Sequence, residues 1–159
     1  MKLVSSLSLV AALVVSVCSA SHLDSCPEND SLFDVYSASI NPSSVDPSKE
    51  ICLSIKGELK TDLPLEGSMI KFTVEQPRVL SKDWQVGVYS SLRFPQGTQL
   101  PVSGGGDREL NACFYLPPEF QYTQNGAELL ISAEITSRDK DDDDVSVVCV
   151  TGAARVSRG

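Results

Sequence analysis

Apolar and polar residues alternate with a period of two along several stretches of this chain. Residues 51–55, 70–75 and 128–136 each place apolar side chains on one face and mostly polar side chains on the other, with Leu130 as the exception. One apolar face is typical of half-buried antiparallel strands, and no stretch shows a convincing helical period. The same reasoning predicts further strands at residues 32–40, 84–94, 108–116 and 145–151.

Turn-forming sequences separate these segments. They include Asn41-Pro42, Asp46-Pro47, Leu63-Pro64, Gly104-Gly105-Gly106 and Asn125-Gly126. Proline and glycine at such points favour turns because they fix or free the backbone where the chain reverses. About seven strands at this spacing predict an all-β fold in which two antiparallel sheets pack as a sandwich.

The first twenty residues have the features of a signal peptide. Lys2 is followed by an apolar run at residues 9–15 and then by Cys18-Ser19-Ala20, which places small residues at the two positions read by signal peptidase. The apolar run is too short for a membrane-spanning helix, which needs roughly 20 apolar residues. We therefore expect residues 1–20 to be removed, and residues 21–159 to form a single domain that is secreted or enters a lysosome-like or vacuole-like lumen.

The charge and the histidine content exclude several classes of function. Loss of Lys2 would change the formal charge from −8 to −9, so nucleic acid and anionic membrane surfaces are poor electrostatic partners. His22 is the only histidine, and it lies two residues after the predicted cleavage site, where we expect a mobile chain. Because nucleophilic catalysis needs a rigidly held base, we expect no enzyme activity and no cofactor.

Three other motifs have simple structural explanations. The acidic run at Asp139 and residues 141–144 lacks the glycine and the closing glutamate of a calcium loop, so we expect a solvated hairpin tip and no metal. Gly104-Gly105-Gly106 precedes a predicted strand, whereas phosphate-binding loops precede a helix. Asn29-Asp30-Ser31 is a candidate N-glycosylation site.

Four cysteines remain after the predicted leader, and their wide spacing indicates an extracellular disulfide framework. Cys26 and Cys149 lie near the two ends of the domain, and a bridge between them would tie those ends together. Cys52 and Cys113 lie on the polar faces of their predicted strands, where a bridge would leave the interior free. Four cysteines permit three pairings, and the spacing alone leaves all three open.

The inward-facing apolar residues permit two interpretations. They either fill a sandwich core about 10 Å thick, or they line a cavity between two splayed sheets. Both arrangements need one apolar face per strand, so periodicity does not distinguish them.

The order of several segments resembles the ML lipid-recognition family. This family includes the Niemann–Pick type C cholesterol-transfer protein and fungal phosphatidylglycerol/phosphatidylinositol transfer proteins. The similar segments run in order over almost all of the predicted domain: Cys26, Asp34-Val35, Ile40-Asn41-Pro42, Leu53-Ser54-Ile55-Lys56-Gly57-Glu58-Leu59, Glu66-Gly67, Ile70-Lys71-Phe72-Thr73-Val74, Pro101-Val102, Gly106-Asp107, Phe114-Tyr115-Leu116-Pro117, Ala133-Glu134-Ile135 and Val147-Val148-Cys149-Val150.

The resemblance implies an immunoglobulin-like sandwich with one lipid between its sheets and a bridge between Cys26 and Cys149. Cys52 and Cys113 then remain as a second pair. Many members carry a cysteine pair ahead of the segment matched by Leu100-Pro101-Val102, and this chain has none there, so Cys52–Cys113 would be a replacement cross-link.

We therefore expect a monomeric protein that binds and transfers a sterol or a phospholipid. Loops near Leu63-Pro64-Leu65 and Phe94-Pro95 would contact a membrane transiently during exchange. The alternative is a protein-interaction module or an enzyme inhibitor with a packed core. The predicted lipid-cavity residues are Val35, Ile55, Phe72, Val74, Trp84, Val86, Val88, Phe114 and Ile131.

Overall fold

Antiparallel strands make up most of the fold. The computed structural model describes residues 21–27, 31–64, 66–94, 96–138 and 143–158. Within them lie ten strands, one short α-helix and one 3-10 turn: β1 (Ser21–Ser25), β2 (Phe33–Asn41), β3 (Ser44–Val45), β4 (Glu50–Leu59), β5 (Met69–Gln76), β6 (Leu80–Gly87), α1 (Val88–Ser91), β7 (Leu92–Arg93), β8 (Gly106–Tyr115), η1 (Pro118–Tyr122), β9 (Glu128–Arg138) and β10 (Asp144–Val156). The prediction of an all-β antiparallel fold is confirmed.

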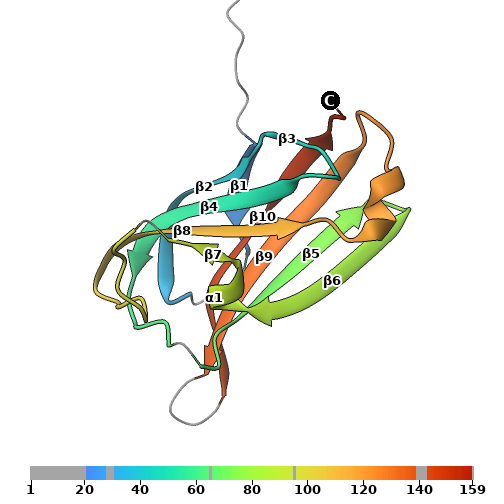
Figure 1. The fold of residues 1–159 in the computed structure, drawn as a ribbon. Coiled ribbons are helices and arrows are strands. Elements are labelled where there is room, and N and C mark those ends of the chain that lie inside the picture. Colours follow the sequence, from blue (N-terminus) through green and yellow to red (C-terminus); the bar gives the residue numbers. More distant parts are fainter. Residues whose placement is uncertain (1–20, 28–30, 65, 95, 139–142, 159) are drawn as a thin grey trace, which may run out of the picture.

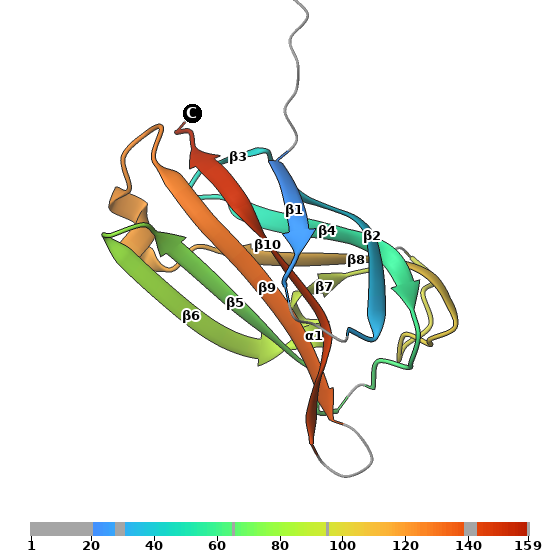
Figure 2. The ribbon, with the colours of Figure 1, turned by 180° about the vertical axis from the view of Figure 1, so that it is seen from behind.

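The strands form one hydrogen-bonded path in the order β6-β5-β9-β10-β1-β2-β4-β8-β7, and β3 adds to β10 in parallel. We call β6, β5, β9 and β10 the β9 half, and β2, β4, β8 and β7 the β4 half. The short strand β1 pairs with β10 on one side and with β2 on the other, so it joins the two halves. The path curls, and the β4 half crosses in front of the β9 half in Figure 1 and behind it in Figure 2.

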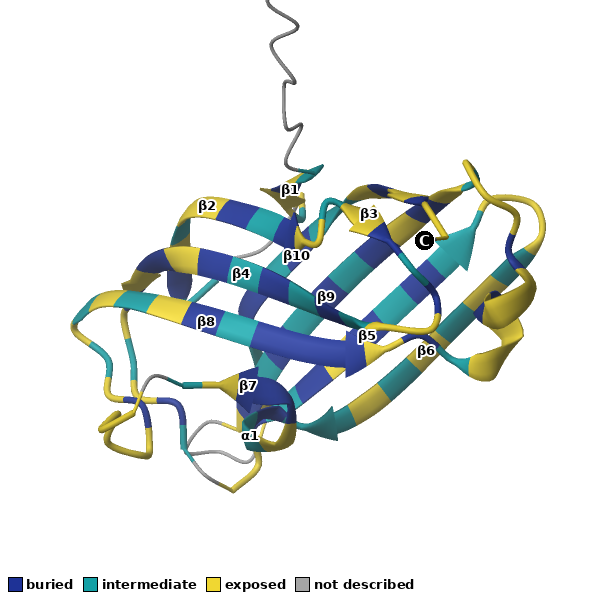
Figure 3. Ribbon diagram, turned by 45° about the horizontal axis from the view of Figure 1, so that its top comes forward, coloured by how far each residue is buried: buried dark blue, intermediate teal, exposed yellow. Residues whose placement is uncertain are grey.

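The core lies between these two halves and follows the predicted alternation. Ile51, Leu53 and Ile55 of β4 are fully buried, as are the inward residues of β5 and β9, whereas Leu130 is 40% exposed. Figure 3 shows the resulting bands of buried and exposed residues along the strands. Fully burying one such side chain contributes about 1.5–3 kcal/mol, so the matched apolar faces of the two halves hold the fold together.

The predicted strand at residues 84–94 is wrong beyond Gly87. The chain leaves β6 there, turns through α1 and returns as the two-residue strand β7. Tyr89 of α1 explains the departure, because its hydroxyl donates to the Leu63 carbonyl and accepts from the Val102 amide at 3.0 Å. Tertiary contacts therefore override the strand propensity of this segment.

The N-terminal segment also differs from the prediction. His22 was expected in a mobile terminus, but it lies in β1 opposite Ser39 of β2. Leu23 is buried against the core, and Gly152 of β10 makes room for it, since a Cβ at Gly152 would lie 2.7 Å from Leu23 Cδ2. The close approach of two backbones thus orders a segment whose own sequence carries little strand signal.

Among the helices in the described part of the chain, none is long and apolar enough to span a bilayer.

Candidate functional site

Two disulfides are present among the described residues, and each joins neighbouring strands of the sheet. Cys26–Cys149 joins the end of β1 to β10, where the Cys26 amide also donates to the Cys149 carbonyl at 3.0 Å. Cys52 and Cys113 are direct partners on β4 and β8, with a Cα–Cα distance of 4.0 Å. Both predicted pairings are confirmed. Because Cys52 alternates with the buried Ile51 and Leu53, its bridge lies on the outward face and leaves the interior free.

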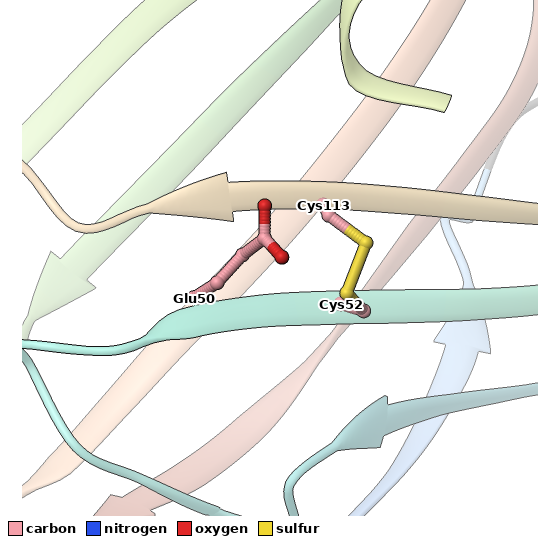
Figure 4. Close-up of side chains that lie close together, drawn as sticks. All are labelled: Glu50, Cys52 and Cys113. Carbon is pink, nitrogen blue, oxygen red and sulfur yellow. A yellow bond between two sulfur atoms is a disulfide. The ribbon is translucent and has the colours of Figure 1, made fainter. Parts of the chain in front are cut away.

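Glu50 lies beside the Cys52–Cys113 bridge, as Figure 4 shows. The ligand atoms of the three residues lie within 4.8 Å of one another, a spacing that a metal ion could use. Here, however, both sulfurs are joined covalently, so neither is a thiolate ligand. The Glu50 carboxylate accepts a hydrogen bond from Arg93 Nη2 at 2.9 Å. This cluster is therefore a cross-link flanked by an ion pair.

The least covered part of the core lies along β6. Among the described residues, six apolar side chains pack against the core while only partly buried, and five of them fall between residues 80 and 94: Leu80, Trp84, Val86, Tyr89 and Phe94, with Val35 of β2 as the sixth. β6 lies at one end of the strand order and pairs with β5. Its inner face therefore borders the space between the halves without a strand beyond it.

The inner face of β6 carries Leu80, Lys82, Trp84 and Val86. We call this face, together with Phe72 of β5 and Phe114 of β8 that contact it, the seam. Three aromatic rings meet there: Phe72 of β5, Trp84 of β6 and Phe114 of β8. The Phe72 and Phe114 ring centroids are 4.4 Å apart, and Trp84 lies 5.4 Å from Phe72 and 5.6 Å from Phe114. Contacts at these distances are ordinary aromatic packing, so the three rings join the two halves across the core.

The remaining predicted cavity residues spread around the core. Ile55, Val74, Val88 and Ile131 are fully buried, and Val86 is partly buried beside Ile70 on the seam. Val88 belongs to α1 instead of sharing a strand with Trp84 and Val86. Val35 lies opposite Gly57 in the β4 half and not along β6. The structure thus gathers the aromatic members of the predicted set and separates Val35 from them.

One polar residue on the seam was missed by sequence reasoning. Lys82 alternates in phase with Leu80, Trp84 and Val86, and its direct partner is the buried Val74. Direct partners in an antiparallel pair share a face, so Lys82 lies on the apolar side of β6. The sequence predicts this strand only from residue 84, although β6 and its period-two pattern begin at Leu80.

The 3-10 turn η1 covers the Lys82 end of the seam. Lys82 Nζ lies 2.9 Å from Glu119 Oε1, and the hydrogen bond from Lys82 is the main reason that the pKa of Glu119 is lowered from 4.5. Phe120 of the same turn is fully buried, and Thr123 Oγ1 donates to Gln76 Oε1 at 3.4 Å. A buried aromatic ring and two polar contacts therefore hold η1 against β5 and β6.

The other end of the seam is closed by α1. Burial of the Tyr89 ring raises the pKa of its hydroxyl.

A pocket of about 180 Å³ lies near this end of the seam, lined by Phe94, Thr98, Val102 and residues 107–110. It is smaller than the roughly 300–1,000 Å³ of typical small-molecule sites. A larger hollow of about 430 Å³ lies over Ser39, Ser54 and Asn111 on the polar outer face of the β4 half.

The other candidate residues lie away from the seam. His22 Nε2 is 3.5 Å from Asp24 Oδ1, and both side chains are exposed. Leu63, expected at an exposed loop that contacts a membrane, is fully buried, so that part of the prediction is wrong. The predicted signal peptide, Asn29, Leu65, Pro95, Asp139 and residues 141–142 lie outside the described residues.

Comparisons with known proteins concern the fold alone. No family model matches the chain, and no curated protein matches it. Among solved structures it is similar to the C-terminal domain of Wzt, with 15% identity, a TM-score of 0.54 and coverage of 85% of this chain and 81% of that chain. A Niemann-Pick type C2 protein from Japanese carpenter ant matches with 16% identity, a TM-score of 0.49 and coverage of 85% and 98%. The similarity to the Wzt domain, at 15% identity, shows a shared fold alone.

Proposed function

We propose that this protein is a secreted lipid-binding and transfer protein of the ML type, with an immunoglobulin-like sandwich that holds one sterol or phospholipid between its halves. In this proposal residues 1–20 are a signal peptide, residues 21–159 form one monomeric domain, and no step involves catalysis or a cofactor. The two disulfides support a secreted or lumenal location, since such bonds persist in oxidising compartments. The segments that resemble the ML family, which occur in the family's order along the chain, support a lipid as the ligand.

The observation that carries the proposal is the partly exposed apolar face of β6. Leu80, Trp84 and Val86 pack against the core yet remain partly accessible, whereas Ile70, Phe72 and Val74 on the neighbouring strand β5 are fully buried. An acyl chain or a sterol ring laid on this face leaves water and gains about 25 cal/mol per Å² of apolar area buried. β6 is an edge strand, so it can move outward without breaking hydrogen bonds to a second neighbour.

The three seam rings fill the space that a lipid needs. Trp84 of β6 packs against Phe114 of β8, with ring centroids 5.6 Å apart, so binding requires a rotation of Trp84 or a displacement of β6 that opens the seam. Both movements exchange aromatic contacts for contacts with the lipid, so the apolar burial that is lost on opening is regained on binding. Lipid binding in this protein is therefore expected to rearrange Trp84.

Trp84 is the only tryptophan in the chain, and its fluorescence reports directly on the seam. Purified protein is incubated with a mixture of sterols and phospholipids and then examined by native mass spectrometry. We expect one lipid per protein molecule. Acyl chains brominated near their middle should quench Trp84 emission, while the same lipids without bromine should not. Absence of any bound lipid across both classes would contradict the proposal.

A second candidate is an interaction module or an enzyme inhibitor with a packed core. The contact between Phe72 and Phe114 favours it, because the predicted cavity residues fill the interior in this structure. If this candidate is correct, Trp84 emission will not respond to brominated lipids. Partners would then bind through exposed residues such as Tyr115, which is 64% accessible at the end of β8.

A further inference from the structure

Four side chains of β6 lie on its inward face, Leu80, Lys82, Trp84 and Val86, and Lys82 is the only charged one among them. Its neighbours in that phase, Leu80 and Trp84, pack against the core, yet the Lys82 side chain is 43% exposed at the η1 end of the seam. A lysine in this position lays its methylene groups along the apolar surface and keeps its ammonium at the solvent boundary. The seam therefore has an apolar floor and a cation at one end.

The partner of this cation is replaceable. The Lys82–Glu119 pair joins side chains that are both nearly half exposed, and such pairs contribute only about 0–1 kcal/mol. Phe120, which is fully buried, holds η1 in place independently of this pair. The Glu119 carboxylate can thus turn toward water without release of the turn.

Lys71 provides a natural comparison on the neighbouring strand. It also forms an ion pair, with Asp83 at 3.6 Å, and its side chain is 48% exposed. Lys71 alternates with the buried Ile70 and Phe72, so it lies on the outer face of the sheet. The two lysines are alike in exposure and pairing, and they differ in the face on which they lie.

We propose that Lys82 binds the anionic headgroup of the lipid, a phosphate or a carboxylate, while the acyl chain lies along Trp84 and Val86. This inference rests on the proposed lipid-binding function and specifies its ligand as an anionic lipid. The headgroup takes the place of the Glu119 carboxylate at the ammonium. Along β6 the path from Lys82 to Val86 is about 13 Å long, at about 3.3 Å per residue, which accommodates much of an extended acyl chain.

The test compares two lipids that share an oleoyl chain and differ in charge. Monomeric 1-oleoyl lysophosphatidate and 1-monooleoylglycerol are titrated into the full-length domain while Trp84 emission is recorded. We expect Lys82→Gln to weaken lysophosphatidate binding about fivefold and to change monooleoylglycerol binding less than about twofold, because only the anionic lipid uses the ammonium. Lys71→Gln should leave both affinities within about twofold, and circular dichroism should show that both variants fold.

Glu119→Gln separates a headgroup site from a structural ion pair. Removal of the competing carboxylate should tighten lysophosphatidate binding, and 0.5 M salt should weaken it in the wild type, since the headgroup stays near solvent. Inorganic phosphate alone should leave Trp84 emission unchanged, because without the acyl chain nothing covers the seam. A phosphate response equal to that of the lipid would overturn the lipid as the ligand.

The outcomes separate this inference from the function on which it rests. An equal loss for both lipids in Lys82→Gln, or weaker lysophosphatidate binding in Glu119→Gln, would overturn the headgroup site and leave lipid binding intact. Tight binding of monooleoylglycerol without binding of lysophosphatidate would do the same. Failure of both lipids to bind wild-type protein, together with no adduct in native mass spectrometry, would overturn the proposed function and the inference with it.

Discussion

The two sides of the curled sheet are closed by different means. On one side β1 hydrogen-bonds to both β10 and β2, Leu23 is buried beneath it, and Cys26–Cys149 fastens its end. On the other side β6 and β8 face each other through the side chains of the seam, chiefly Trp84 and Phe114. Backbone pairing and a covalent bond hold the first side, whereas side-chain contacts that can rearrange hold the second. The comparison indicates where the molecule can open.

Removal of the disulfide at the closed side should have the largest effect. The Cys26→Ser/Cys149→Ser variant is expected to lose about 3–5 kcal/mol of unfolding free energy, because the bridge constrains a span of 123 residues in the unfolded chain. Urea denaturation measures this loss. The Cys52→Ser/Cys113→Ser variant, with a span of 61 residues, should lose about 0.6 kcal/mol less from loop entropy. A larger loss in the second variant would show that Cys52–Cys113 contributes more to stability than Cys26–Cys149.

Crowding of the contact between β1 and β10 should have the next largest effect. In Gly152→Val the new side chain would collide with Leu23 and with the His22 carbonyl, which lies 2.8 Å from an ideal Cβ. We expect a loss of about 1–3 kcal/mol and weaker amide protection in β1. The control is Ala153→Val on the adjacent exposed position, which should change stability by less than about 0.5 kcal/mol. Equal effects at the two positions would show that β1 does not need this close approach.

Truncation of a valine to alanine on β5 and on β6 tests how tightly the seam is packed. Val74→Ala removes two methyl groups from a fully buried site on β5 and should cost about 2 kcal/mol. Val86→Ala removes the same atoms from a partly buried site on β6 and should cost less than about 1 kcal/mol. Thermal or urea unfolding gives both values. A cost at Val86 equal to that at Val74 would mean that the seam is as tightly closed as the core.

The smallest expected effect concerns the ion pair at the η1 end of the seam. Lys82→Gln should raise the pKa of Glu119 toward 4.5, because the hydrogen bond from the lysine is the main cause of its lowering. The lowered pKa stabilises the fold above pH 4.5, and this contribution is lost as the pH falls through the folded-state pKa. NMR titration of the Glu119 carboxyl measures the shift. An unchanged pKa in the variant would show that Lys82 does not hold the carboxylate in solution.

The strand alternation predicted much of the fold because each strand carries its own burial pattern. The pattern at residues 51–55 placed Cys52 on the outward face of its strand, away from the buried Ile51 and Leu53, and the structure agrees. β1 was missed because its pairing depends on β2 and β10, and within β1 only Leu23 is buried. α1 was missed because the hydroxyl of Tyr89 bonds to Leu63 and Val102, which are distant in the sequence.

The candidate site was predicted in part for a related reason. Alternation correctly gave the inward face of Phe72, Trp84 and Phe114, but it carries no information on the distance between the two halves. It therefore left open whether these rings line a cavity or touch one another. Lys82 was missed for another reason, since the predicted strand begins at residue 84 whereas β6 begins at Leu80.

The placement of the two disulfides has a consequence for how such a protein changes over evolutionary time. Cys26–Cys149 joins the end of β1 to β10, Cys52–Cys113 joins β4 to β8, and neither bridge connects β5 or β6 to β8. Substitutions that widen or narrow the interior can therefore accumulate without altering the geometry of any covalent bond. A lineage that keeps these four cysteines is free to change the shape of its interior one side chain at a time.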